Sequence, residues 1–181
     1  GEVVDVADGT VLATLSDPPL WYVGPVVQGE RVFFVGDVDD ARVRARAYDL
    51  RSRDSELVWE NAWVRELPSP RQYAEALVHE GLVYAVNQDG TLHVLSATDG
   101  SLVYRKGLPL GSVYASPALV GEHLLFIDER CKAILLKPGT TYQRVGRGRL
   151  PDEIRASPAI IGERLYLRGL ERLYAIDAPE R

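Results

Sequence analysis

The sequence predicts an all-β chain built from one repeated unit, and three observations support this expectation. SPALVGEHLLF at 116–126 recurs as SPAIIGERLYL at 157–167, a shift of 41 positions. The same shift backwards gives EALVHEGLVYA at 75–85, and a further shift of 51 gives GPVVQGERVFF at 24–34. No segment places apolar residues at helical spacing over a length that would bury one face. Four short strands repeated about every 40 residues are typical of the blades of a β-propeller.

The first two strands of each unit are expected to form a hairpin. In each copy a short apolar run meets a polar pair that contains glycine, and an alternating apolar run follows. Glycine supplies the positive φ that tight turns require. The pairs are Gly29-Glu30, Glu80-Gly81, Gly121-Glu122 and Gly162-Glu163.

A third strand follows in every unit, and a shorter fourth strand closes most of them. The expected third strands are 45–50, 91–96, 132–137 and 172–177. The expected fourth strands are 56–60, 101–106 and 142–148. Each unit is therefore one four-stranded antiparallel blade, and the blades start near residues 20, 71, 112 and 153.

The two ends of the chain are complementary in this scheme. VVDVADGTVLATL at 3–15 aligns with VLSATDGSLVY at 94–104 through a shared Asp-Gly, so the chain enters at the end of a third strand and then supplies a fourth. The last unit stops after its third strand. We expect one propeller unit over 1–181 in which 1–16 supply an outer strand able to complete the last blade, because a closed sheet leaves no open edge.

The composition excludes several classes of partner. Asp and Glu (26) outnumber Lys and Arg (21), for a net charge of -5, so we expect no nucleic-acid partner, which would need a clustered basic surface. No run approaches the roughly 18 apolar residues that span a bilayer, so no membrane span is expected in this segment. The chain contains no methionine, which predicts that a signal peptide or an upstream domain has been removed.

One stretch resembles a known family. GTLHVLSATDGSLVYRKGL at 90–108, followed by YASPALVGEHLLFID at 114–128, is similar to the repeats of pyrroloquinoline-quinone-type (PQQ-like) β-propellers. Such repeats occur in quinoprotein alcohol dehydrogenases, in outer-membrane assembly lipoproteins of the BamB type and in many exported binding proteins. The resemblance covers essentially the whole chain. It implies a periplasmic or extracellular location and a ring of seven or eight blades.

The same resemblance implies a docking role for an aromatic residue on the outer strand. In the family a tryptophan follows a small residue, an Asp and a turn, and its indole is buried between adjacent blades. Trp59 in RDSELVW fits this place, and Tyr104 takes it in the next copy.

The quinoprotein enzymes of the family imply an alternative. They hold the quinone with a calcium ion, an Asp base and, in many members, an adjacent Cys pair, whereas this chain has one cysteine, Cys131. Asp37, Asp39 and Asp40 could mimic a calcium loop, but they lack the full set of about 6–8 oxygen ligands. We expect no cofactor and no metal, with PQQ and calcium as the alternative, and we interpret the aspartates as a solvated hairpin tip.

The other candidates for chemistry are scattered. His79, His93 and His123 occupy different places in the repeat and lack partners at ligand spacing, so structural roles are favoured. Arg130 and Lys132 flank Cys131 and could lower its pKa, although a small half-buried residue is the favoured role. The charged run at 37–54 is expected to be an exposed long hairpin, with a partner-binding loop as the alternative.

One repeated position is the candidate binding site. Tyr22, Tyr73, Tyr114 and Arg155 stand just before the four first strands at spacings of 51, 41 and 41. Inner strands of a propeller run along its central channel, so these residues are expected around one channel mouth. Tyrosines offer adaptable contacts to a peptide or to an anionic or sugar-like ligand. Packing of blade on blade is the alternative reading.

The predicted function is therefore a non-catalytic binding or scaffolding module with a protein or small-ligand partner at the channel mouth. The alternative is a segment of a PQQ-dependent dehydrogenase. A segment of a larger ring is expected, with a closed four-bladed ring or two paired chains as alternatives. An isolated arc would expose its end blades, which predicts self-association. Ser116 and Ser157 are expected to start inner strands, because their equivalents, Gly24 and Glu75, lack the hydroxyl.

Overall fold

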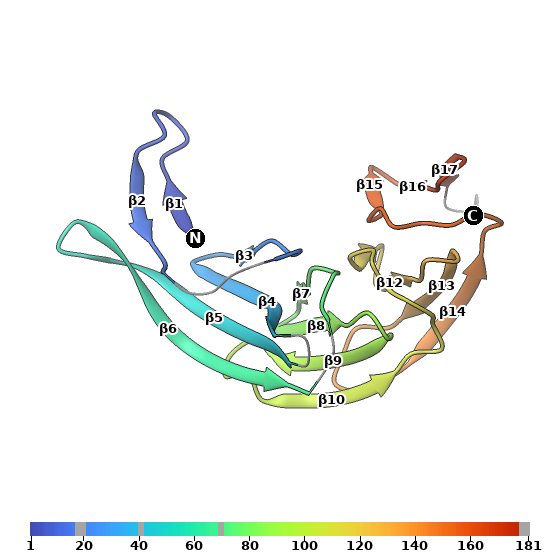
Figure 1. Ribbon diagram of the computed structural model, residues 1–181, viewed down its shortest axis with the longest axis horizontal. Coiled ribbons are helices and arrows are strands. Elements are labelled where there is room, and N and C mark those ends of the chain that lie inside the picture. Colours follow the sequence, from blue (N-terminus) through green and yellow to red (C-terminus); the bar gives the residue numbers. More distant parts are fainter. Residues whose placement is uncertain (17–20, 40–41, 69–70, 178–181) are drawn as a thin grey trace.

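The computed structural model describes residues 1–16, 21–39, 42–68 and 71–177. Its regular structure in these ranges consists of β-strands, without a helix. Figure 1 shows the sheets following one another along a curved arc, with the N-terminal hairpin at one end and the C-terminal sheet at the other. The predicted all-β fold with antiparallel four-stranded blades is confirmed, although the arc is not closed into a ring.

The blades appear in chain order, and neighbouring strands within each are antiparallel. Blade 1 contains β3 (Val26–Gln28), β4 (Arg31–Asp39), β5 (Arg42–Arg53) and β6 (Glu56–Leu67). Blade 2 contains β7 (Leu77–His79), β8 (Leu82–Val86), β9 (Thr91–Ser96) and β10 (Leu102–Gly107). Blade 3 contains β11 (Ala118–Val120), β12 (His123–Ile127), β13 (Lys132–Leu136) and β14 (Arg144–Arg149). Blade 4 contains β15 (Ala159–Ile161), β16 (Arg164–Arg168) and β17 (Leu173–Asp177).

Blade 1 differs from the sequence-based expectation in its long outer hairpin. The run at 37–54 was expected to be exposed, but β5 alternates charged side chains with small apolar ones, and Val43, Ala45 and Ala47 are fully buried. These three residues belong to the core between blades 1 and 2. The prediction of an exposed hairpin is therefore wrong for most of β5, because every second residue faces the neighbouring blade.

The N-terminal residues form a hairpin of their own. Strands β1 (Glu2–Val4) and β2 (Val11–Thr14) pair with each other, and Leu15 packs on the outer face of blade 1. The described part of blade 4 has three strands, so the expected completion of that blade by residues 1–16 is not formed here. The reason is geometric, because β2 is already paired with β1 and the two ends of the arc lie apart (Figure 1).

The core lies between blades rather than within one sheet. One cluster joins blades 1 and 2 around Phe33 and Leu95, and a second joins blades 2 and 3 around Tyr84 and Phe126. The third, between blades 3 and 4, has five buried members against twelve in each of the others. Blade 4 is therefore held by less apolar contact than the other blades. Its junction should be weaker, because the free energy gained on association grows with the apolar area that is buried.

Candidate functional site

The four residues of the candidate site form one continuous row. The ring centroids of Tyr22 and Tyr73 are 4.9 Å apart, and those of Tyr73 and Tyr114 are 5.1 Å apart. The guanidinium carbon of Arg155 lies 5.0 Å from the centroid of the Tyr114 ring. Centroid spacings of this size are those of interacting aromatic pairs and of cation–π contacts. We call Tyr22, Tyr73, Tyr114 and Arg155 the aromatic row, and its role in binding stays a prediction.

The aromatic row is partly held from its sides. Gln88 donates its side-chain N–H to the Tyr114 hydroxyl at 3.2 Å, and Arg71 donates to the Tyr73 hydroxyl at 3.3 Å. Tyr73 and Tyr114 are half-buried, whereas Tyr22 is 55% exposed and Arg155 is also exposed. The two ends of the row are therefore open to a partner, and its middle is anchored.

A ladder of hydrogen bonds crosses the blades two residues after the aromatic row. The backbone N–H of Glu75 donates to Ser116 Oγ at 3.0 Å, and that of Ser116 donates to Ser157 Oγ at 3.0 Å. The N–H of Gly24 donates to the Glu75 carboxylate at 3.1 Å. At each of these three junctions, the later blade provides a side-chain oxygen that accepts a backbone N–H of the preceding blade. Ser116 and Ser157 therefore join neighbouring blades. The sequence signal for this role is that Ser recurs after 41 positions.

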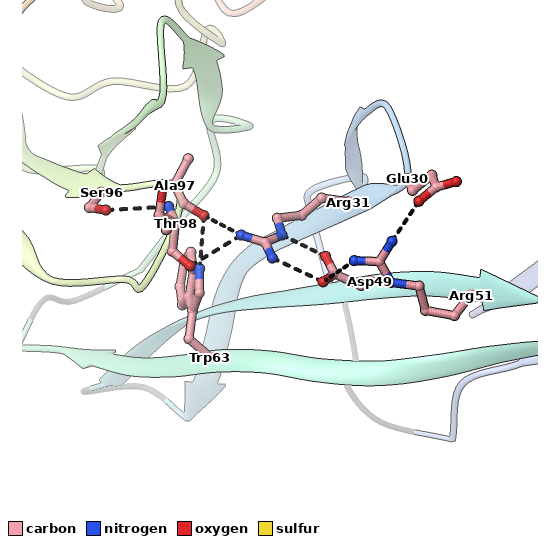
Figure 2. A network of polar contacts seen from close by, with 8 residues as sticks. All are labelled: Glu30, Arg31, Asp49, Arg51, Trp63, Ser96, Ala97 and Thr98. Carbon is pink, nitrogen blue, oxygen red and sulfur yellow. Dashed lines mark hydrogen bonds and ion pairs between the residues drawn. The ribbon is translucent and has the colours of Figure 1, made fainter.

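Blades 1 and 2 are joined by a second polar contact, shown in Figure 2. Arg31 donates from Nε and Nη2 to the carboxylate of Asp49, at 2.6 and 3.0 Å. Its Nη1 reaches the backbone carbonyls of Ala97 and Thr98 in blade 2, at 3.0 and 3.1 Å. These hydrogen bonds from Arg31 hold the pKa of Asp49 below its ordinary value. Arg51 adds a contact of 3.1 Å to the same carboxylate.

The docking tryptophan is Trp63, not Trp59 as the resemblance implied. The indole N–H of Trp63 donates to the Ala97 carbonyl at 3.0 Å (Figure 2). A Cβ on Gly100 would lie 2.5 Å from the Trp63 ring, so the glycine makes room for the indole. Trp59 packs instead on the opposite face of blade 1, beside Phe34. A bulge in the pairing of β5 with β6 separates the two tryptophans and puts Trp63 on the side that faces blade 2.

Asp37, the first of the aspartates interpreted as a solvated hairpin tip, is buried, so that interpretation is wrong for this residue. Asp37 is 5% exposed, and its carboxylate accepts the backbone N–H of Gln72 in blade 2 at 2.6 Å. Asp40 and the side chain of Asp39 lie outside the described part of the chain. Within the described part, no group of three or more His, Cys, Asp or Glu is placed to hold a metal ion.

Two of the three histidines line the same pocket, which the sequence did not predict. His79 and His123 line one open pocket of about 450 Å³ between blades 2 and 3, with Glu80 and Glu122. His93 is 2% exposed, and burial lowers its pKa to about 4, so it is neutral near pH 7.

The surroundings of Cys131 do not lower its pKa, as the flanking Arg130 and Lys132 could have done. Cys131 is 3% exposed in the cluster between blades 3 and 4. Burial raises the pKa of its thiol, with the carboxylates of Asp152 and Asp128 acting in the same direction. A raised pKa disfavours the nucleophilic thiolate, so a packing role fits this residue.

Comparisons with known proteins agree with this arrangement. Residues 1–180 match the family described as outer membrane protein assembly factor BamB. No curated protein matches the chain. The crystal structure of BamB from Moraxella catarrhalis is similar with a TM-score of 0.65 and 22% identity, over 86% of this chain and 46% of that chain. A europium-containing methanol dehydrogenase is similar with a TM-score of 0.56 and 14% identity, over 70% of this chain and 24% of that one.

These likenesses concern the fold, because both identities are low. The matched region covers less than half of either solved relative. In the described residues no helix is long and apolar enough to cross a membrane.

Proposed function

Because the chain belongs to the family of the outer membrane protein assembly factor BamB, we propose that it is a non-catalytic scaffolding module of an exported protein, with a protein partner bound at the aromatic row. The continuous contact from Tyr22 to Arg155 is the observation that supports this proposal.

The chemistry of the aromatic row favours an extended peptide segment as the partner. Tyr22 offers an exposed ring at one end, and Arg155 offers an exposed cation at the other. Aromatic faces bind apolar side chains at a small cost in entropy, and a guanidinium binds carboxylates through paired hydrogen bonds. A segment that carries both apolar and acidic side chains matches this order. A small anionic or sugar-like ligand is the alternative occupant.

The proposal is tested by peptide binding measured as fluorescence anisotropy. The probes are a labelled extended peptide of alternating Phe and Glu and its counterpart with Lys for Glu. The wild-type chain should prefer the Glu peptide, and Tyr22→Ala combined with Arg155→Ala should abolish this preference. Trp21→Ala is the control, because Trp21 is exposed to a similar degree (56%) next to Tyr22 and outside the row. Equal loss in the control, or no binding by the wild type, would refute the assignment.

A quinoprotein segment is the second candidate, and the likeness to a methanol dehydrogenase supports it. The residues described here fit poorly, since Cys131 is buried and the chain has no second cysteine to form an adjacent pair. Titration with the quinone and calcium separates the two candidates. A bound chromophore with dye-linked alcohol oxidation would support the enzyme, and an unchanged spectrum would support the scaffold.

The family of the outer membrane protein assembly factor BamB supports the proposed exported location. Fractionation of cells that produce the tagged natural protein tests it, and recovery in the cytoplasmic fraction would contradict a periplasmic or extracellular location.

A further inference from the structure

The outermost strand of blade 3 carries three arginines in one line. In the described sheets β14 is an edge strand, with β13 as its one neighbour. Three residues that share one face of β13 each lie opposite an arginine of β14, and the pairs are Lys132 with Arg149, Ile134 with Arg147 and Leu136 with Arg144. A bulge before the last pair keeps Arg144 in line, because a spacing of three would otherwise put it on the opposite face from Arg147. We call Lys132, Arg144, Arg147 and Arg149 the basic strip.

The basic strip differs from the arginines of blade 1 in how its charges are met. In blade 1, Arg44 contacts Glu66 at 3.0 Å and Arg51 contacts Glu30 at 2.7 Å. Among the residues that the structure describes, no ion pair and no side-chain hydrogen bond involves the basic strip, and all four of its residues are exposed. Their charges are therefore available to a partner.

The sequence around the basic strip is positively charged, although the chain as a whole is acidic. Residues 101–150 contain eight Lys and Arg against three Asp and Glu, whereas the whole chain has a net charge of -5. Of the three acids, Asp128 is buried, and its carboxylate accepts the backbone N–H groups of Gly111 and Lys132 at 2.8 and 2.9 Å. This carboxylate is therefore held by the backbone, and in the described residues it makes no ion pair with the strip.

Two open hollows follow the basic strip. One, of about 400 Å³, is lined by Gly148 and by the strip without Arg144. The second, of about 520 Å³, shares Lys132 and Arg149 with the first. Like charges directly opposite each other on two strands are destabilising. The pair of Lys132 and Arg149 therefore costs stability until an anion lies between the two side chains.

The edge of β14 offers backbone groups as well as charge. Figure 1 shows β14 on the outer side of the arc, while blades 2 and 4 pack on the two faces of blade 3. Backbone N–H and C=O groups on the outer side of an edge strand have no partner in the sheet and can pair with another strand. Charges on an edge strand commonly prevent such pairing, but positive charges do so only against a strand that is not acidic.

We propose that β14 binds an extended acidic segment of a partner protein, which adds to blade 3 as a fifth strand. Residues two apart in a strand share a face at a spacing of about 7 Å, so carboxylates at alternate positions meet Arg147 and Arg149 together. A guanidinium binds a carboxylate through paired hydrogen bonds, and the edge supplies main-chain hydrogen bonds. A nucleic acid or a lipid surface would use the charges and leave the edge unused. The surface lies on an outer strand, so it is separate from the aromatic row.

Binding of a labelled peptide, measured by fluorescence anisotropy, tests the basic strip. The probe alternates Thr and Glu, and its counterpart has Gln for Glu. The wild type should bind the Glu peptide, and Arg147→Gln combined with Arg149→Gln should weaken this binding at least about tenfold, the usual effect of losing charged hydrogen bonds. Arg168→Gln combined with Arg172→Gln is the control, because it removes the same charge from exposed positions of blade 4 and should leave binding intact. Equal loss in the control, equal binding of the two peptides or no binding by the wild type would overturn the proposal.

Further probes separate the addition of a strand from attraction between charges. A Thr-Glu peptide methylated on every backbone nitrogen carries the same charge but cannot donate hydrogen bonds to β14, so it should bind at least about tenfold more weakly. An equal affinity would contradict an added strand. Oligothymidylate and vesicles of phosphatidylglycerol supply phosphates without a strand, and both should bind more weakly than the Glu peptide. Tighter binding of either one, lost in the Arg147→Gln, Arg149→Gln variant, would assign the strip to a nucleic acid or to a membrane instead.

Discussion

At the residue scale, Trp63 and Trp59 form a natural pair for testing how blades 1 and 2 are joined. Trp63→Phe removes an N–H that donates to the Ala97 carbonyl, whereas the buried indole nitrogen of Trp59 has no hydrogen-bond partner among the described residues. We expect Trp63→Phe to lower the free energy of unfolding by about 1 kcal/mol more than Trp59→Phe does. Urea unfolding followed by circular dichroism measures both. A greater loss in Trp59→Phe would restore the sequence-based assignment.

That assignment was wrong for a physical reason. The sequence places Trp59 at the family's position, and the repeat gives no sign that β6 continues to Leu67. The bulge between Ala47 and Tyr48 changes which face each tryptophan takes. A single extra residue in a strand reverses the side on which later residues lie, and single-sequence patterning does not detect it.

His93 makes stability depend on pH. Burial lowers its pKa from the ordinary 6.5 to about 4, so between these values the unfolded chain takes up a proton that the folded chain excludes. Stability should therefore fall as the pH drops from 6.5 to 4, by about 3 kcal/mol in total, and this contribution should level off below pH 4. Urea unfolding of wild type and His93→Phe at several pH values isolates it from the carboxylates. Parallel curves for the two proteins would show that His93 is not responsible.

At the element scale, the serine ladder is expected to stabilise the junctions between blades. Ser116→Ala and Ser157→Ala each remove the acceptor of a backbone N–H in the preceding blade. Each substitution should lower the free energy of unfolding by about 1 kcal/mol. Ser52→Ala, at an exposed position in β5, is the matched control and should change it by less than about 0.5 kcal/mol. Equal values for all three variants would mean that water replaces the hydroxyls at no cost.

Most strands followed from the repeat, because glycine turns and alternating apolar runs mark them locally. Strand β5 was expected over 45–50, but its burial was not, since arginine at every second position hid three buried apolar residues. The aromatic row was also found by register alone, since equivalent positions of a repeat lie at equal heights on successive blades. The contact distances within it, and the pocket that His79 and His123 share, depend on how the blades are packed and have no sequence signal.

At the scale of the whole molecule, stability should vary along the arc, because each blade touches only its neighbours. Blade 2 is covered on both faces, and all five residues of β8 are buried. Blade 4 is covered on one face, and four of the five residues of β17 are exposed. Amide hydrogen exchange followed by mass spectrometry should therefore be slowest in β8 and β9 and fastest in β17 and the β1–β2 hairpin. Uniform exchange along the chain at low concentration would contradict the nearest-neighbour description, since it would make the arc one cooperative unit.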